Sequence, residues 1–135
     1  MQLQDAEKIS LVNTSITDPK TLTKTSKSLA QLKRGLVELS ILTIINSGEY
    51  LYYAEKIRER LSETELAQPK GTLYPALKKL MKEKIIDQHY DESDLGTPRK
   101  HYFLTEKGRI YYEELDKYWS KLNQTIESLK KRPGW

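Results

Sequence analysis

Apolar residues change their spacing several times along the chain, and each change predicts a different element. Residues 32–46 predict a helix that is buried on most sides, because apolar residues stand at too many positions for one stripe. These residues are Leu32, Leu36, Val37, Leu39, Ile41, Leu42, Ile44 and Ile45. Gly48 follows and supplies the left-handed conformation that commonly ends a helix. A second amphipathic helix is expected at about 52–61, and the polar residues 62–68 predict a connection.

A third helix is expected from Lys70 to about Glu83. Its inward stripe has spacings of three and four residues and consists of Leu73, Ala76, Leu77 and Leu80. We interpret Thr72 as the N-cap. That start places Pro75 in the first turn, where a missing N–H removes no helical hydrogen bond.

After the third helix the apolar spacing shortens towards two residues. Residues 85–90 and 100–104 predict two strands, and Gly96 and Pro98 suit the loop between them. Thr105 is the expected N-cap of a last helix that continues to about residue 131. Its apolar face consists of Tyr111, Leu115, Tyr118, Trp119, Leu122, Ile126 and Leu129.

This order of elements predicts an α+β fold that is mainly α-helical, a winged helix-turn-helix domain with a long C-terminal dimerisation helix. We expect a polar, flexible N-terminal arm over residues 1–30, the DNA-binding domain over 31–104 and the dimerisation helix over 105–135. The arm has no sustained apolar period, although a short helix at 5–11 is compatible with it. It is either a leader without a role or a basic arm that contacts DNA or a partner subunit through Lys20, Lys24 and Lys27.

Composition excludes several classes of protein. No apolar run approaches the roughly 20 residues of a membrane span, and the first residues do not resemble a signal peptide, so we expect a cytoplasmic protein without a membrane partner. The sequence contains no cysteine, which excludes disulfides, thiolate nucleophiles and zinc–cysteine sites. His89 and His101 are candidate cross-strand neighbours, but no third metal ligand is indicated. Without a phosphate loop or a nucleophile motif, we expect no enzyme, metal or cofactor.

Charge is concentrated on the third helix. The whole chain carries a net charge of +4, whereas residues 70–84 contain five lysines and one acid. In a helix-turn-helix, such a helix enters the major groove and its lysines neutralise phosphates. The expected DNA-binding residues are Lys70, Gly71, Thr72, Tyr74, Pro75, Lys78, Lys79 and Lys82, with Arg99 and Lys100 on the wing. The alternatives are that the lysines only solvate the helix and that Arg99 pairs with Asp91 or Glu92.

Two separated motifs resemble the PadR-type winged-helix regulators. Residues 71–80 (GTLYPALKKL) are similar to the family's recognition helix, and residues 99–108 (RKHYFLTEKG) to its wing strand and following turn. The resemblance covers about residues 32–130. The chain departs from the family pattern at Lys84, where glycine is frequent, and in the wing strand at His101 and Phe103.

The resemblance implies a transcriptional regulator, usually a repressor, that dimerises through its C-terminal helix. The two-fold symmetry of such a homodimer predicts a near-palindromic operator in double-stranded DNA. The chain's length is similar to that of the small members with a single C-terminal helix. In some of these a tryptophan lines a cavity between the subunits and stacks on flat hydrophobic compounds. Trp119 stands at that position, and is either part of such an effector site or a packed interface aromatic. A winged helix that binds proteins instead of DNA is the alternative function.

Overall fold

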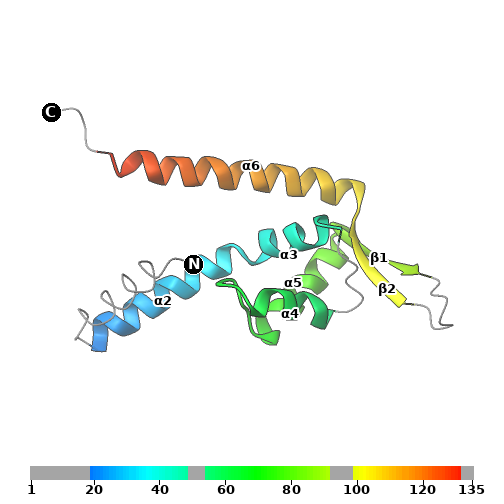
Figure 1. The fold of residues 1–135 in the computed structure, drawn as a ribbon, viewed down its shortest axis with the longest axis horizontal. Helices are drawn as coiled ribbons and strands as arrows, with labels where there is room; N and C mark the ends of the chain where they lie inside the picture. Colours follow the sequence, from blue (N-terminus) through cyan, green and yellow to red (C-terminus); the bar gives the residue numbers. More distant parts are fainter. Residues whose placement is uncertain (1–18, 49–53, 92–98, 132–135) are drawn as a thin grey trace. The chain divides into compact units, whose positions relative to one another are not determined.

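A computed structural model of the chain describes residues 19–48, 54–91 and 99–131 (Figure 1). The chain divides after Gly35 into two compact units, and α2 (Pro19–Gly35) belongs to the first. The second unit contains α3 (Val37–Asn46), α4 (Ala54–Ser62), α5 (Lys70–Lys82), β1 (Ile86–Asp91), β2 (Arg99–Leu104) and α6 (Glu106–Leu129). These elements confirm the predicted fold class, mainly helical with a small antiparallel sheet and a long C-terminal helix.

Residues 19–31 of the helix α2 lie in a segment for which the sequence predicted no regular structure. The helix passes the boundary expected at residue 30 and ends at Gly35. Few of its residues are apolar, so a search for apolar periodicity does not detect it. The short helix considered for residues 5–11 lies outside the described residues.

Leu36 interrupts the helix that was predicted to be continuous over residues 32–46. Its backbone angles, φ −103° and ψ 1°, lie outside the α-helical region, and α3 begins at Val37. Leu32 was expected to be buried but lies in α2, where its side chain is 68% exposed. The prediction for the other end is confirmed, because Gly48 follows α3 with a left-handed φ of 85°.

The core of the second unit forms around α3. This helix contacts α5, α6 and β2. The largest fully buried side chains are Ile41, Leu42, Ile57, Leu73, Leu80, Ile85 and Ile86. All of them are aliphatic, so removal of apolar surface from water is the main force that holds the helices against the sheet.

A tight turn joins α5 to β1. The Ile85 N–H donates to the Leu80 carbonyl at 3.0 Å, and the Lys84 N–H donates to the Met81 carbonyl at 3.1 Å. Together these bonds form a Schellman motif, in which Lys84 takes the left-handed conformation with φ 61°. The turn brings the chain directly from the end of α5 into the first strand.

The two strands pair as an antiparallel hairpin with Ile86 opposite Leu104 and His89 opposite His101. Side chains alternate between the faces of a strand. Ile86, Tyr102 and Leu104 pack on the core, so His89 and His101 lie on the other face. The predicted strands and their pairing are thus confirmed.

Thr105 caps α6 as predicted. Its Oγ1 accepts a hydrogen bond from the Gly108 N–H at 2.9 Å and donates to the Lys84 carbonyl at 2.6 Å. Gly108 is buried, and a Cβ at this position would lie 1.8 Å from the Ile85 carbonyl oxygen. The start of α6 is therefore packed tightly against the turn that leads into β1. Among the described helices, none combines the length and the apolarity needed to cross a membrane.

Candidate nucleic-acid interface

The two sides of α5 have opposite chemistry. The buried side consists of Leu73, Leu77 and Leu80. The exposed side contains Gly71, Pro75, Lys78 and Lys82, at spacings of four, three and four residues. Lys70 and Lys79 are exposed as well, and the Lys79 ammonium lies 3.8 Å from the Glu83 carboxylate. The leucines fix the helix in the core, while small residues and then lysines follow one another along its outer side.

The helix begins earlier than the sequence predicted. Pro69, in extended conformation, is the N-cap, and its carbonyl accepts hydrogen bonds from the N–H groups of Thr72 and Leu73, each at 3.0 Å. The interpretation of Thr72 as the cap is therefore wrong. Pro75 lies beyond the first turn, where its ring removes the hydrogen bond that a residue would donate to the Gly71 carbonyl. Gly71 and Pro75 are both exposed near the start of α5, and neither adds a long side chain to the outer surface.

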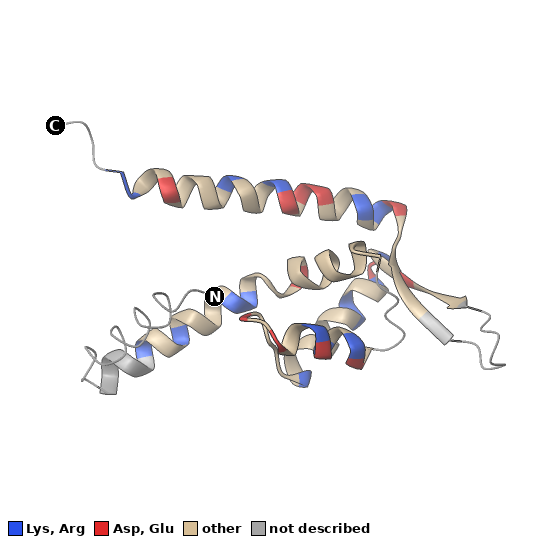
Figure 2. Cartoon of the chain, viewed as in Figure 1, with Lys and Arg blue, Asp and Glu red and all other residues tan. Residues whose placement is uncertain are grey.

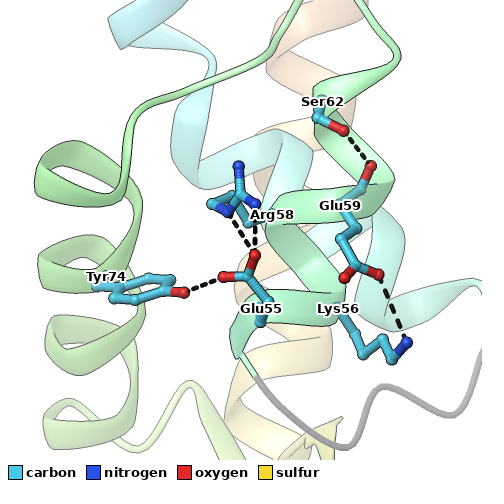
Figure 3. A network of polar contacts seen from close by, with 6 residues as sticks. All are labelled: Glu55, Lys56, Arg58, Glu59, Ser62 and Tyr74. Atoms are coloured by element: carbon cyan, nitrogen blue, oxygen red, sulfur yellow. Dashed lines mark hydrogen bonds and ion pairs between the residues drawn. The ribbon is translucent and has the colours of Figure 1, made fainter.

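Tyr74, predicted to contact DNA, is half-buried and joins α5 to α4 (Figure 3). Its hydroxyl donates a hydrogen bond to one carboxylate oxygen of Glu55. Arg58 donates to the other oxygen through both Nε, at 2.9 Å, and a terminal nitrogen. Glu55 thus holds a tyrosine of one helix and an arginine of its own helix, and it fixes the two helices relative to each other.

The same network determines the charge of its members. The hydrogen bonds from Arg58 and Tyr74 lower the pKa of Glu55 from 4.5 to about 2. The bond to Glu55 raises the pKa of Tyr74 and also the pKa of Arg58. Glu55 is consequently an anion at physiological pH, and its negative charge is balanced by its own neighbours.

Sequence reasoning did not identify Glu55 or Arg58 as functional residues. Their spacing of three along a helix indicates a local ion pair, which is common on exposed helices. The contact with Tyr74 joins residues that lie nineteen positions apart. Neither helix carries a sequence signal for that contact.

The wing is described by its backbone. Arg99 lies opposite Asp91 in the strand register, and Lys100 lies opposite Tyr90. This register allows both roles predicted for Arg99, a contact with DNA and an ion pair with Asp91 or Glu92. Either role would be played by the side chain. The side chains of Arg99 and Lys100 lie outside the described part of the structure.

The histidine pair on the outer face of the hairpin forms an aromatic contact. The rings of His89 and His101 are 5.5 Å apart and nearly perpendicular, and Phe103 packs edge-on against His89. Within the described ranges, no group of three potential ligands could hold a metal ion. The geometry is that of packed strand residues.

The apolar face predicted for α6 separates into two parts. Tyr111 and Leu115 pack against the core of their own unit, and the Tyr111 hydroxyl donates to Glu38 in α3 at 2.8 Å. Burial and this bond raise the pKa of Tyr111 to about 12. The other predicted residues are exposed, namely Tyr118, Trp119, Leu122, Ile126 and Leu129. Of the predicted face, the distal part is therefore the one that presents apolar surface to solvent.

A cavity of about 380 Å³ opens beside Trp119. It lies between α3, α6, the end of α4 and the segment that follows α4. Its lining is mostly apolar, with Arg60 and Asp116 as charged members; the other lining residues are Leu36, Leu39, Ser40, Thr43, Ile44, Leu61, Thr64 and Leu66. The volume is in the range of pockets that bind small molecules.

Comparison with known proteins places this geometry in a family. Residues 41–114, more than half of the chain, match the model of the transcriptional regulator PadR-like family. A PadR-like transcriptional regulator from Bacillus cereus is 32% identical, with 76% of this chain and 99% of that chain covered and a TM-score of 0.65. A curated relative from Lysinibacillus sphaericus, whose function is uncharacterised, is 27% identical over 95 residues, 70% of this chain and 87% of its own.

A solved PadR family regulator from Eggerthella lenta shares the fold at 21% identity, with a TM-score of 0.70 and coverage of 86% of this chain and all of that one. Members of this family are DNA-binding regulators rather than enzymes, which confirms that part of the sequence prediction. The chain belongs to the PadR-like family of transcriptional regulators.

Proposed function

We propose that the chain is a repressor that binds a near-palindromic operator as a homodimer and reads DNA with α5. The observation that carries the proposal is the exposed side of α5. Its small residues, Gly71 and Pro75, allow the helix to approach base edges, and Lys78 and Lys82 meet phosphates. The leucines on the opposite side anchor the helix so that it enters the groove as a rigid body.

Titration of the protein onto labelled DNA tests the proposal. Fluorescence anisotropy would compare a duplex from the upstream region of its own gene with a scrambled duplex at two salt concentrations. Lys78→Ala with Lys82→Ala is expected to weaken binding and to reduce its salt dependence, because each lost phosphate contact lowers the slope by about 0.9. The matched control, Lys130→Ala with Lys131→Ala, removes two exposed lysines from the end of α6.

Equal and weak binding to both duplexes would refute an operator near the chain's own gene. No binding at low salt would refute DNA recognition, and the winged helix would then be a protein-binding module. An apolar protein contact would show little dependence on ionic strength, in contrast to a contact with phosphates.

Gly71→Ala separates stability from binding. An added Cβ meets no atom within 4 Å, and alanine stabilises a helix interior by up to about 1 kcal/mol relative to glycine. We expect unchanged or higher thermal stability together with weaker operator binding, since the methyl group would stand between the helix and the groove. Unaltered affinity would show that the start of α5 does not approach the DNA closely.

We further propose that a small, flat hydrophobic effector binds beside Trp119 at the dimer interface and releases the DNA. The cavity and the 40% exposed indole support this proposal. An effector acts only if it binds the DNA-competent and DNA-incompetent dimers with different affinity. In a Trp135→Phe background, titration with anilinonaphthalene sulfonate is expected to quench Trp119 fluorescence, and Trp119→Leu should weaken dye binding. Undiminished dye binding by that variant would refute the site.

A further inference from the structure

The helix α2 carries a basic side that the recognition helix and the wing do not account for. Lys24, Lys27 and Arg34 are exposed. Their spacings of three and seven residues place them on one side of the helix. No aspartate or glutamate occurs between residues 19 and 37, and Figure 2 shows positive charge and no negative charge along the described part of α2. The helix therefore offers an anionic partner a surface without local neutralisation.

The apolar residues of α2 lie on the other side. Leu29 is 53% and Leu32 is 68% exposed, and helical geometry turns both away from the line through Lys24 and Arg34. Any contact made by the leucines consequently leaves the basic side outward. Lys33 is half-buried and lies on the side of the leucines, so the basic side carries three of the four cations whose side chains are described in α2.

We infer that the basic side of α2 is a second DNA-binding surface, which contacts phosphates of the duplex without reading its sequence. This inference rests on the proposed function, because α5 must first bring the chain to DNA. From Lys24 to Arg34 the stripe spans about 15 Å of helix axis at 1.5 Å per residue. Duplex DNA carries one charge per roughly 1.7 Å of its axis, so a surface of this length meets several phosphates.

Two observations favour DNA over a membrane surface as the partner. Residues 19–35 contain three leucines and no aromatic residue, whereas a helix that lies in a membrane interface buries a broad apolar face in which tryptophan or phenylalanine accompanies leucine. The second observation is connectivity, since α2 is joined to α3 through Leu36. A surface tethered to a DNA-bound domain acts at high effective concentration, so even weak phosphate contacts add to affinity. The family match begins at residue 41, so α2 is outside the region that defines the family.

The experiment measures the salt dependence of duplex binding for the full chain and for Lys24→Gln with Lys27→Gln. We expect the slope of log affinity against log salt to become shallower by up to about 1.8, at 0.9 for each lost contact. The upstream and the scrambled duplex should lose affinity by the same factor, because phosphate contacts carry no sequence information. Lys130→Gln with Lys131→Gln removes the same charge from the end of α6 and should leave the slope unchanged.

Other outcomes separate this inference from the proposed function. If Lys78→Ala with Lys82→Ala weakens binding but the α2 variant retains the original slope, the inference is wrong and the proposed function stands. The inference is also wrong if the α2 variant keeps its DNA slope and instead loses binding to vesicles of phosphatidylcholine and phosphatidylserine. If the unaltered chain binds neither duplex at low salt, both proposals fail. Circular dichroism and sedimentation of each variant exclude a loss of structure as the cause.

Discussion

At the scale of single residues, Lys84 occupies a backbone conformation that favours glycine. Its φ of 61° lies in the left-handed region, which costs a residue with a Cβ roughly 1–2 kcal/mol. The Schellman turn requires this conformation at the residue between α5 and β1. PadR-type sequences often have glycine at this position, so the departure noticed in the sequence has a structural consequence, a strained turn.

Replacement of this residue should relieve the strain. Lys84→Gly is expected to raise the free energy of unfolding by about 1 kcal/mol, measured by urea denaturation. The matched control is Lys82→Gly, which removes an exposed lysine from the helical part of α5. That change should lower stability by roughly 0.5–1 kcal/mol. A destabilised Lys84→Gly protein would show that the lysine side chain makes a stabilising contact that outweighs the strain.

At residue 108 a glycine is required because there is no space for a side chain, and not because the backbone angles favour glycine. Gly108→Ala places a methyl group against the Ile85 carbonyl oxygen, which would lie 1.8 Å away. We expect the free energy of unfolding to fall by about 1–3 kcal/mol, the usual cost of overpacking. In the same denaturation experiment, Gly71→Ala should cause no loss. Equal stability of the two variants would contradict the tight contact between α6 and the turn.

The sequence predicted some of these residue roles and missed others for physical reasons. Thr105 could be predicted as a cap because capping is local: its hydroxyl accepts a hydrogen bond from a residue only three positions further along the chain. Thr72 satisfies the same local pattern, but Pro69 starts the helix earlier. Proline is favoured where a helix begins because its φ is fixed and it has no N–H. A polar residue near a helix start is therefore an ambiguous cap wherever a proline precedes it.

At the scale of elements, the geometry of the helix-turn-helix depends on the Glu55 network. Tyr74→Phe removes the donor of the contact between α5 and α4, and Glu55→Ala removes its acceptor. In a double-mutant cycle, their effects on unfolding should be non-additive, because the two residues share one hydrogen bond. Tyr74→Phe combined with Glu59→Gln should be additive, since Glu59 pairs with Lys56 on another side of α4 (Figure 3). Additivity in both cycles would refute a contact between Tyr74 and Glu55.

The network also predicts a pH dependence. The folded-state pKa of Glu55 is lowered from 4.5 to about 2, so the carboxylate contributes stability above its unfolded pKa and loses it as the pH falls towards 2. Glu55→Gln lacks this contribution. Urea denaturation between pH 7 and pH 3 should therefore show a stability difference that is constant near neutrality and shrinks below about pH 4.5. A constant difference over the whole range would contradict the lowered pKa.

Most elements of the second unit follow from apolar spacing, whereas α2 and the break at Leu36 do not. The pattern detects helices that bury a stripe, and α5 buries three leucines. In α2 the leucines Leu29 and Leu32 are exposed. Because they pack on no core, they do not need to recur at helical spacing. Apolar residues occur both before and after Leu36. The apolar pattern therefore continues through the break, although the backbone leaves the helical conformation there.

At the scale of the whole molecule, the distal half of α6 determines the predicted assembly. Tyr118, Leu122, Ile126 and Leu129 recur at spacings of four, four and three residues and are between 45% and 74% exposed. A contiguous apolar face of this kind usually marks an interface. A second copy is the expected partner, because a two-fold dimer presents two copies of α5 to two half-sites about one turn of DNA apart.

Ile126→Glu tests this assembly, because it places a charge in the centre of the expected interface. An unpaired charge at such a position is costly to bury, so sedimentation should show a shift from dimer to monomer. Gln124→Glu introduces the same charge on the other side of α6 and should leave the dimer intact. Operator binding should weaken with the loss of the dimer, since the two half-sites are then bound independently. A dimeric Ile126→Glu protein would show that the subunits meet elsewhere, and the exposed face of α6 would need another partner.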